Sequence, residues 1–208
     1  MGRIGTDESG KGDYFGYLVV AGAYSDEKTD AKLKEMRVRD SKSVSDAVCV
    51  KLAARIKKTC AHEVLKISPE KYNKLYDKFG NLNRLLAWGH AKVIDNMTKK
   101  TKCMKVLSDK FSEENLIEDY LDQMKKKNPA LGKIRLERKV RAESDMAVAA
   151  ASILARAEYL RTLRALSKGI GYSLPKGATH VRQAREDIVR MHGEDVLQHV
   201  AKLHFKIV

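Results

Sequence analysis

The pattern of hydrophobic and polar residues predicts strands near the start of the chain and then helices that alternate with strands. Arg3 to Thr6 is expected to form a short strand, and Tyr14 to Tyr24, which is rich in Val, Tyr and Phe, a second one. Further strands are expected at residues 62–67, 103–107 and 133–141, where apolar runs or alternation occur. This order predicts an α/β protein whose sheet has antiparallel and parallel portions.

Helix-start signals and helical periodicity account for most of the remaining chain. Ser45 and Asn81 are suitable N-caps, and Ser68-Pro69-Glu70 combines a capping serine with a proline at the first helical position. Helices are therefore expected before residue 36, over 45–58, 68–80, 81–97 and about 113–126, from 143 onward, and once or twice after 175.

The chain has 208 residues, of which 43% are hydrophobic, and this is enough for a core of its own. We expect a single domain over residues 1–208, with a core to about residue 165 and a C-terminal helical extension over about 166–208. The longest apolar stretches, such as Ala147 to Ala155, are shorter than the roughly 20 residues of a membrane span. The first residues do not resemble a signal peptide, so we expect a cytoplasmic protein.

The charge of the chain favours an anionic partner. Lys and Arg number 41 against 27 Asp and Glu, which gives a formal net charge of +14. A field of this sign attracts polyanions such as nucleic acid, although a solvated lysine-rich surface would give the same composition. Three cysteines without CxxC spacing and six histidines without a metal-binding motif argue against a disulfide framework or a zinc site.

Acidic residues follow three of the predicted strands. Asp7 and Glu8 end the first strand, Asp109 ends the strand that starts at Cys103, and Asp145 lies where the last strand gives way to a helix. If these strands are neighbours, the carboxylates converge and need a cation or a raised pKa. Oxygen ligands of this kind suit magnesium or manganese, and two ions roughly 3.5–4 Å apart perform phosphodiester hydrolysis. Taken singly, an acid such as Asp109 or Asp145 has a structural role at a turn or helix start more often than a catalytic one.

A glycine-rich turn follows the first two acids. Gly10 and Gly12 allow the backbone to approach a ligand closely, and Lys11 adds a positive charge. The spacing is not that of a Walker phosphate-binding loop, and a tight hairpin without a ligand explains the glycines equally well.

Taken together, these segments resemble the type 2 ribonucleases H, and within them ribonuclease HIII. The matching motifs are Gly5–Gly16 (GTDESGKGDYFG), Asp40-Ser41-Lys42, Asn83–His90, Ser108–Phe111, Glu143–Ala155 and Leu174–Gly177. The resemblance implies a ribonuclease H-like fold, in which a central mixed five-stranded sheet is flanked by helices. It also implies endonucleolytic cleavage of the RNA strand of an RNA–DNA hybrid, which leaves 5′-phosphate and 3′-hydroxyl ends.

The resemblance assigns roles to particular residues. Its catalytic, metal-binding carboxylates match Asp7, Glu8, Asp109 and Asp145, which would hold two Mg²⁺ or Mn²⁺ ions. Its substrate-binding residues match Ser9, Gly10, Lys11 and Gly12, whose backbone would contact the 2′-hydroxyl groups that distinguish RNA from DNA, together with Lys42 near a phosphate.

Two features favour ribonuclease HIII over its sibling ribonuclease HII, which incises at single ribonucleotides in DNA. Ser9 and Lys11 have the HIII form of the first motif, and Ala178 stands where HII has a junction-sensing tyrosine. HIII enzymes usually carry an N-terminal substrate-binding domain, whereas this sequence begins only six residues before Asp7, so the domain is either naturally absent, removed or replaced by the basic surface. Binding should then be weak and salt-dependent. HII-like incision and a non-catalytic hybrid-binding module remain the alternatives, and a monomer is expected.

Overall fold

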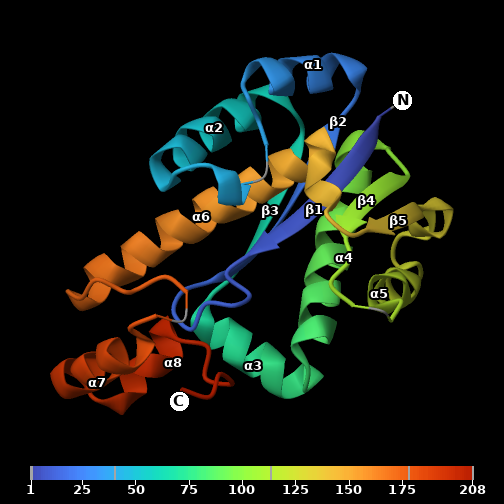
Figure 1. The fold of residues 1–208 in the computed structure, drawn as a ribbon. Coiled ribbons are helices and arrows are strands. Elements are labelled where there is room, and N and C mark those ends of the chain that lie inside the picture. Colours follow the sequence, from blue (N-terminus) through green and yellow to red (C-terminus); the bar gives the residue numbers. More distant parts are fainter. Residues whose placement is uncertain (1, 40, 113, 178, 208) are drawn as a thin grey trace.

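The computed structural model describes residues 2–39, 41–112, 114–177 and 179–207. Its strands are β1 (Arg3–Ser9), β2 (Leu18–Ser25), β3 (His62–Ile67), β4 (Lys105–Asp109) and β5 (Arg135–Lys139). Its α-helices are α1 (Glu27–Glu35), α2 (Asp46–Thr59), α3 (Pro69–Phe79), α4 (Leu82–Thr101), α5 (Leu116–Met124), α6 (Met146–Ile170), α7 (Val181–His192) and α8 (Leu197–Val200). Figure 1 shows their arrangement.

The strands form one mixed sheet in the order β3-β2-β1-β4-β5, which confirms the predicted five-stranded sheet. β2 runs antiparallel to both β1 and β3, whereas β1, β4 and β5 are parallel to one another. The register of the central parallel pair sets Thr6 opposite Ser108. The residues that follow these two, Asp7 and Asp109, therefore lie at the same edge of the sheet.

The two faces of the sheet are covered by different helices (Figure 1). Alternate side chains of β2 lie on opposite faces of the sheet. Val19 and Ala21 belong to a hydrophobic cluster with α2 and α6, whereas Val20 belongs to a cluster with α4 and α5. α6 approaches β1 very closely, since a Cβ atom on Gly5 would lie 2.3 Å from the backbone of Ala147. The small side chains at the start of α6 thus allow the helix to pack tightly on the strand that carries Asp7.

Local sequence signals located most helix starts correctly. The side chains of Ser45, Ser68 and Asn81 accept hydrogen bonds from the first backbone amides of α2, α3 and α4, as predicted. The strand expected from Tyr14 begins only at Leu18, because the residues before it form a loop that pairs at Phe15 with Ala201 near the C-terminus.

The C-terminal helices pack against the rest of the molecule through an extended apolar cluster. Ile188 of α7 and Leu197 of α8 belong to the same cluster as Leu160 and Leu163 of α6. Cys49, Cys60 and Cys103 are free thiols, and the first two are buried. Within the described part of the chain, the helices are too short or too polar to cross a membrane.

Candidate active site

A cavity of about 440 Å³ lies at the carboxyl ends of β1 and β4. It is lined by Asp7, Glu8, Ser9, Gly10, Lys11, Gly12, Asp13, Ser41, Asp109, Ser152 and Arg156. Three of the four acids expected from the sequence thus meet at one site, together with the first four residues of the expected substrate-binding set. Ser41, Ser152 and Arg156 were not singled out from the sequence.

Asp7 lies at the centre of the three carboxylates. Its Oδ1 atom accepts a hydrogen bond of 2.8 Å from the backbone amide of Glu8. Burial, followed by the negative charge of Glu8, raises the pKa of Asp7 to about 7, and Asp109 adds a smaller repulsion. The ionised carboxylate is therefore held in an unfavourable environment that a bound cation would relieve.

Glu8 is stabilised as a carboxylate by two side chains. Its Oε2 atom lies 3.2 Å from Nε2 of His90, and its Oε1 atom lies 2.7 Å from the ammonium group of Lys11. Burial alone would raise the pKa of Glu8, but the hydrogen bond to His90 and the positive charge of Lys11 lower it to about 2. Glu8 is thus ionised at neutral pH, whereas the neighbouring Asp7 is only partly ionised.

His90 is a component of the site that the sequence analysis did not identify. The sequence places it only among six histidines without a metal-binding motif, yet it is fully buried on α4 between Glu8 and Thr6, whose Oγ1 lies 2.9 Å from Nδ1. Its ring also stacks on Phe111, with centroids 5.3 Å apart. The available signal was its helical spacing, because His90 lies four residues from both Leu86 and Ile94, on the apolar face that covers the sheet.

Asp145 does not join the other three acids, which corrects the expectation of a four-carboxylate cluster. One of its oxygens accepts a 2.6 Å hydrogen bond from Nε of Arg3, and the other caps α6 by accepting from the amide of Ala147 at 2.8 Å. Arg3 also pairs with Asp30. The cap directs the carboxylate toward the first turn of the helix and toward Arg3, instead of toward the cavity.

A different acid lies in the segment that contacts Asp109. The short 3₁₀ helix Ala142–Ser144 packs on β4, and the backbone amide of Ala142 donates a 3.3 Å hydrogen bond to Oδ1 of Asp109. Glu143 follows directly and is half-buried. Among the described residues, its carboxylate has no hydrogen-bond or ion-pair partner. Glu143 thus lies one residue from a direct contact of Asp109, whereas Asp145 is bound to Arg3 and to the first turn of α6.

A comparison with a model of the family described as ribonuclease HII gives a match over residues 4–208. The ribonuclease HIII of Protochlamydia amoebophila (strain UWE25) is 44% identical over 205 residues, which are 98% of this chain and 66% of the relative. The ribonuclease HIII of Chlamydia felis (strain Fe/C-56) is 44% identical over 207 residues, 98% of this chain and 67% of the relative. The chain belongs to the ribonuclease HII family. It spans about two thirds of the length of the curated relatives it matches.

Solved structures of the ribonuclease HII family have the same fold. Bst-RNase HIII in complex with Mn²⁺ superposes with a TM-score of 0.88 at 32% identity, over 100% of this chain and 68% of that one. Aquifex aeolicus RNase H3 gives a TM-score of 0.80 at 29% identity, over 98% of this chain and 72% of that one. The ribonuclease H-like fold expected from the sequence is therefore confirmed.

The donor set of this ribonuclease HII family member suits a divalent cation. Asp7, Glu8 and Asp109 supply hard oxygen atoms, and burial and the charge of Glu8 raise the pKa of Asp7, so a cation beside Asp7 would favour its ionised form. In the arrangement observed among the described residues, no three acidic, histidine or cysteine side chains are close enough to form a metal site. Lys11 neutralises Glu8 in this arrangement.

The side chain of Lys42, one of the substrate positions expected from the resemblance, falls outside what the structure describes. The backbone of Lys42 lies in the short helix Ser41–Ser43, next to a residue that lines the cavity, but its side chain is outside the described residues. Asp40 and Ala178 are also outside them. The neighbouring amide of Gly177 donates a 2.6 Å hydrogen bond to Asp13, so the segment before Ala178 reaches the glycine-rich turn.

Two glycines in the turn allow its steric and functional roles to be separated. Gly10 has a φ angle of +87°, and a Cβ atom there would lie 2.2 Å from the carbonyl oxygen of Tyr17, whereas Gly12 has open space. We expect Gly10→Ala to lower the free energy of unfolding by about 2 kcal/mol. Gly12→Ala should keep its stability and, if its backbone contacts RNA, raise KM for hybrids. Urea unfolding and steady-state kinetics check both variants, and equal stability losses would contradict this steric distinction.

The glycine loop, residues 10–16, is anchored by the C-terminal segment. The backbone amide of Gly16 donates a 2.9 Å hydrogen bond to the carbonyl oxygen of Val200. The backbone amide of Lys202 donates a 2.8 Å hydrogen bond to the carbonyl oxygen of Tyr14. The ammonium group of Lys202 donates to the carbonyl of Asp13 at 2.6 Å, and the side chain is fully buried. Burial lowers the pKa of Lys202 to about 7.

This buried lysine gives a pH-dependent prediction for stability. The pKa of Lys202 is about 7 in the folded protein, below the ordinary value of 10.5. The free-energy cost of burying its charged ammonium group is therefore largest below pH 7, and it disappears as pH rises toward 10.5. The stability of the wild type relative to Lys202→Met should therefore increase with pH, by at most about 1.4 kcal/mol per pH unit. Urea unfolding between pH 6.5 and about 9.5 measures the difference. A difference that does not change with pH would refute the assignment of a buried, titrating ammonium group.

Proposed function

We propose that the chain is an endoribonuclease that hydrolyses the RNA strand of RNA–DNA hybrids. The supporting observation is the meeting of Asp7, Glu8 and Asp109 in one cavity, bordered by the glycine loop. Carboxylates at the ends of neighbouring strands provide metal ligands, and adjacent glycine amides provide donors for a sugar-phosphate backbone. Membership of the ribonuclease HII family and the likeness to ribonucleases HIII support the same activity.

Asp7, Glu8 and Asp109 would hold Mg²⁺ or Mn²⁺, with Glu143 as the fourth carboxylate in place of Asp145. When bound, two such ions activate a water molecule and stabilise the leaving 3′-oxygen, which gives 5′-phosphate and 3′-hydroxyl ends. The Mn²⁺ complex of Bst-RNase HIII, whose fold is the same, supports this cofactor class. The uneven protonation of Asp7 and Glu8 supports it as well, because a cation would favour the ionised form of both.

The other residues of the cavity would position the substrate. His90 fixes the Glu8 carboxylate through one ring nitrogen and is itself held by Thr6 through the other. Ser9, Gly10, Lys11 and Gly12 would contact the RNA strand, with backbone amides near the 2′-hydroxyl groups and the ammonium group of Lys11 near a phosphate. Lys42 would contact a further phosphate. These contacts would place the scissile bond over the carboxylates.

The proposed partner is an RNA–DNA hybrid, which the formal charge of +14 favours. A monomer in the cytoplasm remains our expectation. Cleavage should be compared among a hybrid, single-stranded RNA, double-stranded DNA, and DNA duplexes that contain one or four ribonucleotides. Cutting of the hybrid and of the four-ribonucleotide duplex supports an HIII-like activity. Efficient cutting at the single ribonucleotide would favour HII-like incision, and binding without cutting would favour a non-catalytic module.

A further inference from the structure

A second hollow lies beside the catalytic cavity, between the glycine loop, the start of α7 and the C-terminal segment. Two cavities of about 410 and 370 Å³ share Tyr14, Arg182, Phe205 and Ile207, so they form one groove, which we call the C-terminal groove. Gly12 lines both this groove and the catalytic cavity. A strand that leaves the catalytic cavity past the glycine loop would therefore enter the C-terminal groove.

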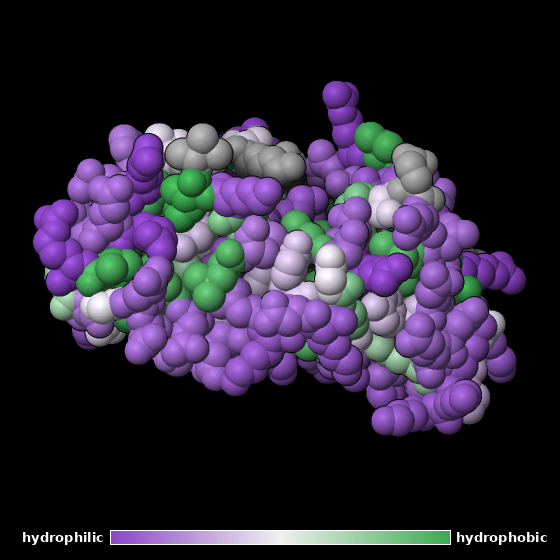
Figure 2. Space-filling view, turned by 90° about the horizontal axis from the view of Figure 1, so that it is seen from below, coloured by the Kyte–Doolittle hydropathy of each residue, from purple (hydrophilic) through white to green (hydrophobic). Residues whose placement is uncertain are grey.

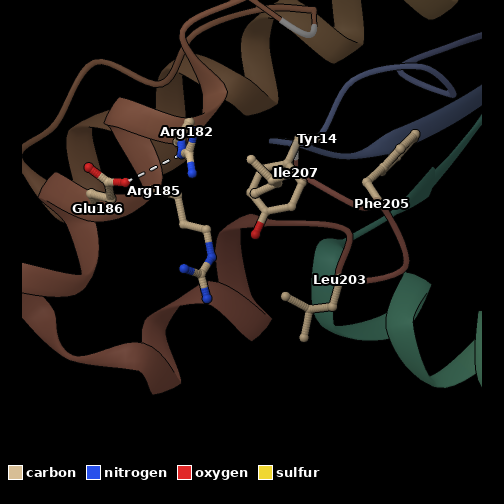
Figure 3. Close-up of a pocket in the computed structure, with 7 residues that line it drawn as sticks. All are labelled: Tyr14, Arg182, Arg185, Glu186, Leu203, Phe205 and Ile207. Atoms are coloured by element: carbon tan, nitrogen blue, oxygen red, sulfur yellow. Dashed lines mark ion pairs between the residues drawn. The ribbon is translucent and has the colours of Figure 1, made fainter.

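The C-terminal groove combines positive charge with aromatic and aliphatic surface. In Figure 3, Arg182 and Arg185 of α7 lie on one side, and Tyr14, Phe205 and Ile207 on the other. Lys206 also lines the groove. The face seen from below in Figure 2 carries hydrophobic patches within a mostly hydrophilic surface. A purely anionic ligand needs only the positive charge, and a purely apolar ligand needs only the apolar surface. Nucleic acid needs both, because it contains phosphates and apolar ring faces.

The cations of the groove are only partly neutralised. Arg185 is paired with Glu194 at 2.7 Å, but Nε of Arg182 lies 3.7 Å from Glu186, and both of these side chains are exposed. Lys206 is exposed and has no ion-pair partner among the described residues. Arg182 and Lys206 therefore remain available to an anionic ligand, and exposed pairs such as Arg182–Glu186 exchange partners at little cost.

The apolar side chains that line the groove favour an unpaired strand over a duplex. A duplex presents phosphates and sugars on its outside and keeps its bases stacked in its interior, so it has no group that fills an apolar recess. An unpaired nucleotide can place its base against aromatic and aliphatic side chains while its phosphate contacts the cations at the rim. Phe205 and Ile207 are half-buried and supply such a surface.

We propose that the C-terminal groove binds an unpaired nucleotide of a strand that leaves the hybrid next to the cleavage site. Arg182 and Lys206 contact its phosphate, and Phe205 and Ile207 contact its base. The inference rests on the proposed function for the identity of the duplex. It adds a preference for junctions between a hybrid and a single strand, where an unpaired flank is present.

The test is a binding measurement that does not depend on cleavage. Fluorescence anisotropy in the presence of chelator compares a blunt hybrid with the same hybrid carrying a short single-stranded overhang. The wild type should bind the overhang hybrid at least about fivefold more tightly, which is the gain expected from one stacked base. Arg182→Gln and Phe205→Leu should each remove most of this advantage. Thermal unfolding verifies that both variants are folded.

The matched control is Arg190→Gln, which removes an exposed cation from α7 outside the groove. It should keep the full overhang advantage. Equal binding of the two hybrids by the wild type would overturn the inference, even if the protein cuts hybrids efficiently. An equal loss of affinity for both hybrids in Arg182→Gln would also overturn it, because it would assign the groove to the duplex. Failure to cut any hybrid, with the overhang advantage intact, would reject the proposed function alone.

Discussion

The Asp7→Asn protein is expected to lose at least about 99% of its hybrid-cleaving activity. Asp7 is the central member of the three carboxylates in the cavity, and the raised pKa marks it as the group that most needs a cation. An amide at this position keeps the shape of the side chain but removes the charge that would hold the ion. A loss of several kcal/mol of transition-state stabilisation corresponds to a rate decrease of about 100-fold or more. Initial rates with Mg²⁺ and with Mn²⁺ measure it.

The same substitution should stabilise the metal-free protein, which separates a catalytic defect from a folding defect. The pKa of Asp7 is about 7 in the folded protein, whereas its ordinary value is 3.8. Between these two pH values the folded state binds more protons than the unfolded state, so the wild type loses stability as pH rises from about 4 to about 7. An asparagine side chain does not titrate, so the Asp7→Asn protein should be more stable than the wild type above pH 7, by on the order of 1 kcal/mol. Near pH 4 the difference in the free energy of unfolding between the two proteins should be smaller. A variant that is inactive and less stable at pH 8 would contradict this account of Asp7.

The second large effect is expected at Glu143 and not at Asp145. Glu143→Gln should reduce cleavage by about 100-fold while stability is retained, because its half-buried carboxylate follows directly on the amide that contacts Asp109. Asp145→Asn should keep most of the activity, since its carboxylate is bound to Arg3 at 2.6 Å. It should instead lose roughly 1 kcal/mol of stability with that ion pair, because asparagine still caps the helix.

The comparison is decisive because the two acids lie in the same short segment and are tested on the same substrate. If Asp145→Asn is inactive and Glu143→Gln is active, the assignment expected from the sequence resemblance holds, and the side chain of Asp145 must reorient when the substrate or an ion binds. If both variants are inactive, five carboxylates are required. Either result would refute the assignment of Glu143 alone.

The strands and helices that depend on local signals could be predicted from the sequence. The predicted helix over 68–80 matches α3, because the capping serine at its start and the left-handed glycine at its C-cap, Gly80, are local properties. Asp7 and Asp109 were identified because acids that follow apolar strands stand out, although only the parallel pairing of β1 and β4 brings them together.

The features that the sequence did not reveal depend on contacts between distant residues. Asp145 was assigned correctly to the start of a helix, but its pairing with Arg3 joins residues 142 positions apart. The burial of Lys202 beneath the glycine loop joins residues 189 positions apart, and its sequence neighbourhood gives no sign of it. The role of His90 follows from the face that α4 turns toward β1. Local patterns specify what each segment is, whereas these contacts depend on where it packs.

The most direct test of the proposed activity is cleavage of an RNA–DNA hybrid with a 5′-labelled RNA strand by the purified chain, with Mg²⁺, Mn²⁺ or chelator. The account predicts fragments cut within the RNA strand, which carry 3′-hydroxyl ends, appear with at least one of the metals and disappear with chelator. They should also be absent with Asp7→Asn. Cleavage that continues in chelator, or an Asp7→Asn protein as active as the wild type, would contradict the central claim that these carboxylates form a metal-dependent nuclease site.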